Sequence, residues 1–185
     1  MGSSKQTLQF RGESLLRRVV LAALSAGCRP VVVVTGAHAE LSGRELNGLD
    51  VQEVFNAGWE TGMASSVRAG IQGLVSMDTD VAAAVLLLCD QPHVTSDLIS
   101  SLLAAHRATG SSVIASAYGE SFGVPALFSR TLFRELMQLE GMSGAKEIIK
   151  RHVREAHFLP FKEGEVDVDT PEDFSRLIGE DVQYE

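Results

Sequence analysis

The sequence is poor in the residues that build disulfide, zinc and common hydrolase sites. Its two cysteines, Cys28 and Cys89, have no cysteine or histidine neighbour at metal-ligand spacing, so we interpret both as small buried apolar residues. The five histidines form no His-Glu-x-x-His pattern, which argues against a zinc site. The sequence also lacks a Gly-x-Ser-x-Gly nucleophile elbow and a complete Walker-type phosphate loop, so it does not favour hydrolases or P-loop proteins.

Long hydrophobic runs are absent as well. The longest apolar stretches, 31–34 and 81–89, are far shorter than the roughly 20 residues that a membrane helix needs. Residues 1–11 are polar and contain no apolar segment of the kind found in signal peptides. We therefore expect a cytoplasmic protein with no membrane partner.

Basic residues are outnumbered, with 16 Lys and Arg against 24 Asp and Glu and a net charge of -8. This balance does not provide the basic stripe that nucleic-acid binding requires, so we expect no nucleic-acid partner. An anionic small ligand is compatible with the charge if a divalent cation accompanies it.

What the sequence does contain is enough apolar material for one core. With 185 residues, 45% of them hydrophobic, and no low-complexity linker, we predict a single domain over 1–185. Hydrophobic periodicity predicts strands that alternate with helices, then an antiparallel excursion beyond residue 110. The expected fold is α/β, with a mainly parallel sheet and helices on both faces. The expected strands cover 31–36, 51–55, 81–89, 112–117, 121–128, 156–160 and 165–168. The expected helices cover 13–26, 37–46, 63–74, 96–107, 130–139 and 144–152. A last helix is expected to begin at Thr170-Pro-Glu-Asp173, with Thr170 as its N-cap and Pro171 at its first position.

The run 81–89 is the most informative segment. A continuous apolar run is typical of a strand that is covered on both faces. Pro92 prevents the strand from continuing, so Asp90 is expected at its carboxyl end, where open α/β sheets bind ligands. The alternative is that Asp90 only ends the strand and caps a turn.

A second acidic segment could complete a metal site. In Val166-Asp-Val-Asp169, alternation would place Asp167 and Asp169 on one face of a short strand. Mg²⁺ prefers oxygen ligands and is commonly held by one or two carboxylates together with phosphates. Alternatively, these acids face solvent or cap the final helix.

Two further segments offer contacts for a ligand. In the loop 56–66, Gly62 allows close approach of the backbone, and Asn56, Ser65 and Ser66 supply hydrogen bonds. Lys5, in the polar N-terminal segment, could contact phosphates. The alternatives are an ordinary strand-to-helix loop and a solvated lysine.

A set of segments, taken in order, resembles one enzyme family. The segments are Met1-Gly-Ser-Ser-Lys5-Gln-Thr-Leu8, the run 31–36, Asn56-x-x-Trp59-x-x-Gly62-Met-x-x-Ser66-x-x-x-Gly70, Cys89-Asp-Gln-Pro92, Gly123-x-Pro125-x-x-Phe128, Gly141-x-x-Gly144-Ala-Lys146 and Asp167-Val-Asp-Thr-Pro-Glu-Asp173. Over nearly the whole chain this pattern resembles the MobA-like nucleotidyltransferases, which include molybdenum cofactor cytidylyltransferase and guanylyltransferase. The resemblance implies a Rossmann-like sheet of the glycosyltransferase-A type.

The resemblance also implies a reaction, in which a molybdopterin phosphate attacks the α-phosphate of CTP or GTP and releases pyrophosphate. Asp90 would hold Mg²⁺, with Asp167 or Asp169 as the second carboxylate, and Lys5 would neutralise the triphosphate. The nucleotide pocket would be lined by Asn56, Gly62, Ser65 and Ser66, and the acceptor side would be shaped by Gly123 and Pro125. A molybdenum enzyme is a further expected partner.

The sequence departs from the family pattern in two places. Members normally carry a hydrophobic strand and a Leu-Ala-Ala-Gly-x-Ser-x-Arg loop before the Met-Gly pair, so this chain is expected to lack that central strand and much of the triphosphate cradle. Met142 also stands where the family often has an acid. Two other functions therefore stay open, namely a nucleotide- or cofactor-binding maturation protein for a molybdenum enzyme, and a sugar-nucleotide pyrophosphorylase.

Overall fold

The computed structural model describes residues 5–77 and 80–181, so the Met1-Gly2 pair lies outside the described residues. The strands are β1 (Gln9–Phe10), β2 (Glu13–Ser14), β3 (Val32–Thr35), β4 (Gln52–Phe55), β5 (Ala83–Leu86), β6 (Val113–Tyr118), β7 (Ser121–Ser129) and β8 (His157–Pro160). The helices are α1 (Leu15–Ser25), α2 (Ala39–Glu45), α3 (Met63–Met77), α4 (Ser96–Thr109), α5 (Phe133–Leu136), α6 (Ala145–Arg151) and α7 (Pro171–Asp181). Short 3-10 turns are η1 (Lys5–Thr7), η2 (Trp59–Thr61), η3 (Arg130–Leu132) and η4 (Lys162–Glu165).

The strands form one larger sheet and two small ones. The larger sheet has the order β5-β7-β6-β8, in which β7 is antiparallel to both β5 and β6 while β8 is parallel to β6. β3 and β4 form a parallel pair, and β1 and β2 form a short hairpin. The predicted α/β class, with parallel sheet elements and a late antiparallel excursion, is confirmed, and the antiparallel strand is β7. The larger sheet was expected to be mainly parallel, and within the described residues it is mixed, because β7 pairs with both β5 and β6.

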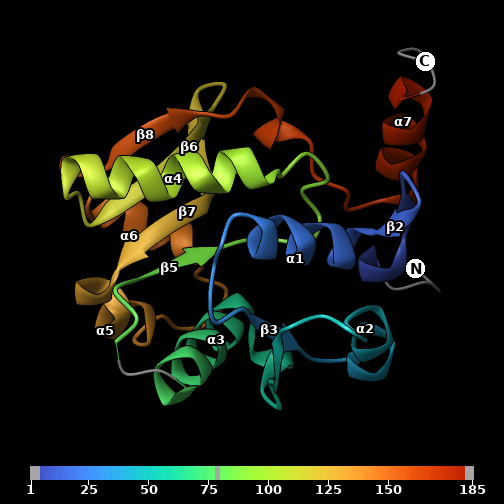
Figure 1. The fold of residues 1–185 in the computed structure, drawn as a ribbon, viewed down its shortest axis with the longest axis horizontal. Coiled ribbons are helices and arrows are strands. Elements are labelled where there is room, and N and C mark those ends of the chain that lie inside the picture. Colours follow the sequence, from blue (N-terminus) through green and yellow to red (C-terminus); the bar gives the residue numbers. More distant parts are fainter. Residues whose placement is uncertain (1–4, 78–79, 182–185) are drawn as a thin grey trace.

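Helices cover both faces of the larger sheet, as predicted (Figure 1). Alternate residues of β6 point to opposite sides. Val113 and Ala115 pack with residues of α3, α5 and α6, including Ile148. Ile114 packs on the other side with Leu102 of α4. The sheet is therefore the middle layer between two layers of helices.

One predicted strand, 165–168, does not form. Lys162–Glu165 is instead the turn η4, in which the backbone amide of Gly164 donates to the Phe161 carbonyl at 3.0 Å and that of Val166 donates to the Glu163 carbonyl at 3.1 Å. The chain can close this turn because Gly164 has no side chain, since a Cβ there would lie 2.5 Å from Cδ1 of Tyr118. Local backbone hydrogen bonds thus replace the expected pairing with a neighbouring strand.

The strand β5 is less buried than its composition predicts. It lies at the end of the strand order and pairs with β7 alone within the described sheet. Of the residues 81–89 only Ala84 is buried, and Leu88 is 37% exposed. The continuous apolar run correctly predicts a strand here, but the prediction of full cover on both faces is wrong for this structure.

The two ends of the described chain pack against each other. Phe10 and Leu15, near the β1–β2 hairpin, form a buried cluster with Val168 and with Leu177 of α7. Figure 1 shows α7 beside β2 of the hairpin. This cluster brings Lys5 close to residues 167–169.

Helix α7 begins directly after Thr170, the N-cap that the sequence predicts, and the structure adds a second hydrogen bond that makes the cap reciprocal. The backbone amide of Asp173 donates to Oγ1 of Thr170 at 3.1 Å, and the amide of Thr170 donates to Oδ2 of Asp173 at 2.9 Å. These hydrogen bonds pair backbone donors that the first turn of a helix otherwise leaves unsatisfied. They also fix the chain direction directly after Asp169.

We expect Thr170→Ala to lower the free energy of unfolding by about 1 kcal/mol, because the variant removes the side-chain acceptor of this cap. Urea unfolding measures the change. Ser175→Ala in the same helix is the matched control, because the Ser175 hydroxyl donates only to the Pro171 carbonyl and caps no amide. Equal losses in the two variants would contradict the capping role.

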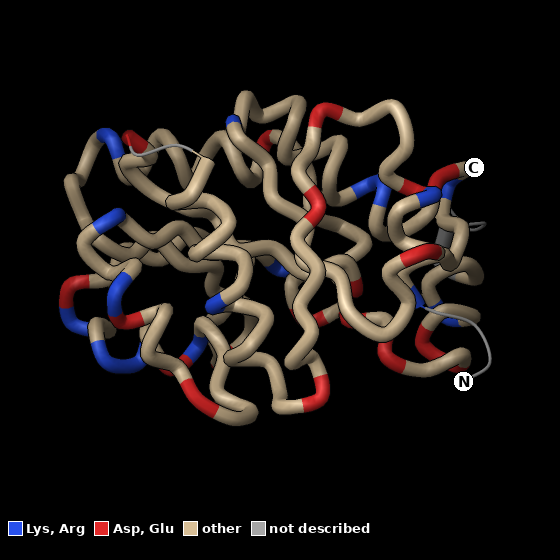
Figure 2. Tube along the Cα trace, turned by 90° about the horizontal axis from the view of Figure 1, so that it is seen from below, with Lys and Arg blue, Asp and Glu red and all other residues tan. Residues whose placement is uncertain are grey.

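Acidic and basic residues are interspersed along the trace (Figure 2). Within the described residues, no helix has both the length and the apolar character needed to cross a membrane.

Candidate active site

Asp90 lies just beyond the carboxyl end of β5, where the sequence places it. The backbone amide of Val168 donates to the Asp90 carbonyl at 2.9 Å, which joins the segment 167–169 to the end of the strand. Val168 is fully buried, while Asp167 and Asp169 on either side of it are exposed. The structure therefore brings together the two acidic segments that the sequence predicts to share a site.

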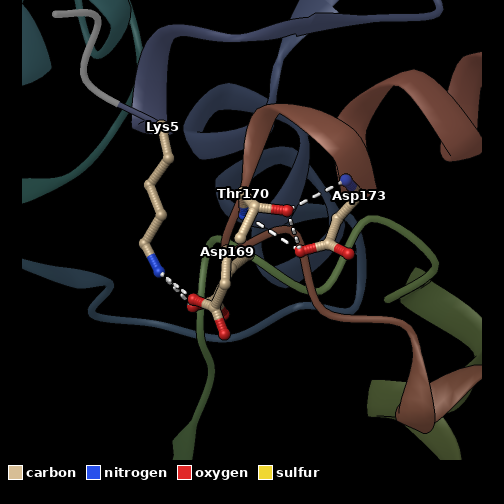
Figure 3. A network of polar contacts seen from close by, with 5 residues as sticks. Lys5, Asp169, Thr170 and Asp173 are labelled. Carbon is tan, nitrogen blue, oxygen red and sulfur yellow. Dashed lines mark hydrogen bonds and ion pairs between the residues drawn. The ribbon is translucent and has the colours of Figure 1, made fainter. Parts of the chain in front are cut away.

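Lys5 joins these acidic segments. Its Nζ lies 2.7 Å from Oδ2 of Asp90 and 3.0 Å from Oδ1 of Asp169, and Figure 3 shows the lysine reaching the carboxylate of Asp169 beside the Thr170–Asp173 cap. Partial burial on its own lowers the pKa of Lys5, but the hydrogen bonds and charges of Asp90 and Asp169 outweigh it and raise that pKa. The ammonium group is therefore charged at neutral pH.

The third carboxylate, Asp167, experiences the negative charge of the other two. Partial desolvation, followed by repulsion from Asp90 and Asp169, raises the pKa of the Asp167 carboxyl, although a hydrogen bond from Gln91 opposes the shift. An added positive charge would relieve this repulsion. The site thus has an excess of negative charge that one lysine only partly compensates.

The donor set is suited to a hard divalent cation. Oδ1 of Asp90 is buried and has no hydrogen-bond partner among the described residues, and the Lys5 ammonium group stands as a cation between two carboxylates. No group of three His, Cys, Asp or Glu side chains within 5–77 and 80–181 is placed to hold a metal unaided. Two carboxylates completed by phosphate oxygens are a common arrangement for Mg²⁺.

The loop before α3 is built around Asn56. Its Nδ2 donates to Oγ of Ser65 at 2.8 Å and to Oγ of Ser66 at 3.1 Å, while its Oδ1 accepts from the Gly58 amide at 3.0 Å. The Ser65 hydroxyl then donates to the Gly62 carbonyl at 2.8 Å. Asn56, Ser65, Ser66 and Gly62, which the sequence predicts to share a pocket, form one hydrogen-bonded unit.

Gly62 connects this unit to the loop at Gly141. Its φ of +112° is a conformation that residues other than glycine rarely adopt. A Cβ at Gly62 would lie 2.7 Å from the carbonyl carbon of Gly141 and 2.9 Å from Sδ of Met142. The Gly141 carbonyl also accepts from the amide of Ala64 at 3.2 Å. The missing side chain of Gly62 thus allows the 141–142 loop to reach the start of α3.

Gly123 and Pro125 are both buried in β7. A Cβ at Gly123 would overlap the hydroxyl group of Tyr118 and lie 3.4 Å from its Cζ, and the Pro125 carbonyl accepts from Oγ of Ser116 at 2.7 Å. Because Gly123 and Pro125 are buried, they can affect an acceptor only by positioning the residues that pack against them.

Sequence reasoning missed two residues that link these parts. Gln91 is 4% exposed, and its Nε2 donates to the Val124 carbonyl at 3.2 Å. Tyr118 lies between Gly123 and Gly164, and its pKa is raised by burial and by the charge of Asp167. Both residues lie near Asp167, because Gln91 donates a hydrogen bond to its carboxylate and the charge of that carboxylate acts on Tyr118. No local pattern in the sequence indicates this proximity.

An open hollow of about 450 Å³ lies beside α2. It is lined by 36–41 together with Phe55 and Trp59, which are 60% and 42% exposed. Helix α2 also contacts η1, the turn that carries Lys5. Trp59 belongs to the motif of the family resemblance, whereas no sequence pattern indicates Phe55.

Comparison with known proteins identifies the family. A family model described as the MobA-like NTP transferase domain matches residues 1–156. The purine catabolism protein PucB of Bacillus subtilis (strain 168) is 32% identical over 187 aligned positions, which cover 96% of this chain and 89% of PucB.

Solved structures agree with this match. The Rv0371c homologue from Mycobacterium sp. strain JC1 superposes with a TM-score of 0.81 at 29% identity, covering 100% of this chain and 91% of that one. Rv0371c from Mycobacterium tuberculosis H37Rv, in a complex with manganese, gives a TM-score of 0.77 at 27% identity and covers 96% and 93%. A divalent metal is thus bound in one of these neighbours. The chain belongs to the MobA-like NTP transferase domain family and is a nucleotidyltransferase.

Proposed function

We propose that this nucleotidyltransferase transfers CMP or GMP from CTP or GTP to the phosphate of a molybdopterin-type cofactor, with Mg²⁺ as the metal. The observation that carries the proposal is the cluster in which Lys5 lies between Asp90 and Asp169 beyond the end of β5. In such a cluster the lysine can bind the phosphates of a nucleotide, and the two carboxylates can bind a divalent cation. The acceptor is inferred from the ordered motifs that resemble the cytidylyltransferases and guanylyltransferases.

In the proposed reaction an oxygen of the acceptor phosphate forms a bond to the α-phosphorus of the nucleotide. The bond from that phosphorus to the bridging oxygen breaks, and pyrophosphate leaves with the electron pair. Such transfer depends mainly on positioning and charge neutralisation, so it requires no protein nucleophile. Bound Mg²⁺ would neutralise charge on the triphosphate and on the leaving pyrophosphate.

The residues of this chain would hold the reactants. The side chain of Lys5 is long enough to move away from Asp90 and Asp169 and to donate hydrogen bonds to phosphate oxygens. The side-chain amide of Asn56 donates a hydrogen bond to the hydroxyl oxygen of Ser66. The Ser66 hydroxyl can therefore donate its own proton to a ligand. Lys146 donates to Oγ of Ser121 at 2.7 Å and lies 5.7 Å from the ring centre of Phe122, so it is a cation beside β7, the strand of Gly123 and Pro125. Its charge could attract the phosphate of an acceptor bound on that side.

The test combines purified protein with Mg²⁺, labelled CTP or GTP, and molybdopterin. We expect pyrophosphate to appear only when one of the nucleotides and the acceptor are both present. Nucleotide binding without pyrophosphate release would favour a maturation protein that binds the nucleotide. Release driven by a sugar 1-phosphate instead would favour a sugar-nucleotide pyrophosphorylase.

A further inference from the structure

The contact between Lys5 and the acidic residues resembles the coordination of a cation. One nitrogen lies within 3.0 Å of an oxygen of Asp90 and an oxygen of Asp169, which belong to segments far apart in the chain. A second oxygen of Asp90, Oδ1, is buried and has no partner among the described residues. The ammonium group therefore fills a position where two carboxylate oxygens converge, while the second oxygen of Asp90 has no hydrogen-bond partner among the described residues.

We infer that Lys5 takes the place of the divalent cation in the metal-free protein, and that it thereby opposes metal binding until a nucleotide arrives. The inference rests on the proposed function only in requiring a divalent cation and a nucleotide at this site. It assigns to Lys5 a role before the reaction, in addition to its contact with phosphates.

The charges of the site explain why the lysine is needed. Asp90 and Asp169 each place a carboxylate oxygen within 3.0 Å of the same ammonium nitrogen, so two like charges face one position. Without the lysine, these carboxylates would attract a divalent cation from solution. The Lys5 ammonium group removes part of this attraction, because a cation that enters must first displace it.

The nucleotide supplies the compensation for that displacement. A metal ion that enters alone leaves the lysine without its carboxylate partners. A triphosphate that enters with the metal offers Lys5 new anionic oxygens, so the metal and the nucleotide favour each other's binding. The lysine can move without unfolding of the core, because its side chain is 31% exposed and that of Asp169 is 68% exposed.

The test measures binding of Mn²⁺ alone by calorimetry, with no nucleotide and no acceptor. We expect Lys5→Met to bind Mn²⁺ at least about tenfold more tightly than the unchanged protein. Lys5→Arg keeps the charge and should bind as weakly as the unchanged protein. Lys150→Met, which removes an exposed lysine of α6, is the matched control and should have no effect.

A second measurement follows the coupling. A non-hydrolysable CTP or GTP analogue should increase the affinity of the unchanged protein for Mn²⁺, and this increase should be much smaller in Lys5→Met. Lys5→Gln serves as the test variant if circular dichroism shows that the methionine variant is unfolded.

Two results would overturn the inference. One is Mn²⁺ binding to Lys5→Met that is equal to or weaker than that of the unchanged protein, and the other is nucleotide coupling that persists unchanged in the variant. Neither measurement involves turnover or the acceptor. Absence of pyrophosphate release would therefore count against the proposed function alone, and unchanged Mn²⁺ affinity in the variant would count against the role of Lys5 alone.

Discussion

Asp90→Asn is expected to reduce turnover by roughly 10³-fold, which corresponds to about 4 kcal/mol of transition-state stabilisation. The amide has nearly the same shape as the carboxylate, but it carries no charge for a divalent cation and weakens the contact with Lys5. The fold should persist, because Asp90 lies after β5 and its side chain is outside the hydrophobic clusters. Steady-state pyrophosphate release measures the loss, and thermal unfolding checks the fold.

Asp97→Asn provides the comparison for this variant. Asp97 is an exposed acid in the first turn of α4, so its loss changes the net charge equally without changing the candidate site. We expect its turnover to stay close to that of the unchanged protein. Full activity in Asp90→Asn would show that the carboxylate is not a metal ligand.

The sequence allowed the position of Asp90 to be predicted because the relevant features are local. The apolar run 81–89, followed by Pro92, indicates both a strand and its end. The cap at Thr170 could be predicted for the same reason, since the residues that make it are three positions apart. Structural features that depend only on residues close together in the sequence could thus be predicted without the structure.

The partnership of Lys5 with Asp90 and Asp169 could not be predicted from the residues alone. Lys5 belongs to a polar segment with no periodic pattern, and it reaches the site because Phe10 packs with Val168 and Leu177. Those contacts join segments that are more than 150 residues apart in the sequence. Local propensity carries no information on such packing. The residues alone indicated only that Lys5 could contact phosphates or be a solvated lysine, and its place beside Asp90 depends on contacts between distant segments.

For the segment around Asp167, the predicted strand is wrong, but the predicted exposure of its two acids is correct. The alternation in 166–169 predicts a strand, and the structure has the turn η4 followed by residues that belong to no helix or strand, the first of which, Val166, is extended. Val168 is nevertheless buried and the two acids beside it are exposed, so the expected alternation of side chains is present without a paired strand. The pattern therefore identified the face of the acids correctly, although the ladder is absent from the described sheet.

Gly62→Ala is expected to lower the free energy of unfolding by about 2 to 4 kcal/mol, through backbone strain and overlap of atoms. At a φ of +112° any side chain is strained, and the new methyl group would lie 2.7 Å from the Gly141 carbonyl carbon. The neighbouring loop must then move away, which removes the hydrogen bond from the Ala64 amide to the Gly141 carbonyl at the start of α3. Urea unfolding measures the loss.

Gly58→Ala is the control in the same loop, because its φ is -94° and a Cβ there would meet its nearest atom, Oδ1 of Asn56, at an ordinary 3.5 Å. We expect a change of at most about 1 kcal/mol in this variant. If Gly62→Ala is no less stable than Gly58→Ala, then the close approach of the two loops does not contribute to stability. If instead Gly62→Ala is destabilised and also binds nucleotide more weakly, its conformation serves both the fold and the pocket, because the Gly62 carbonyl is the acceptor that holds the hydroxyl of Ser65 in place.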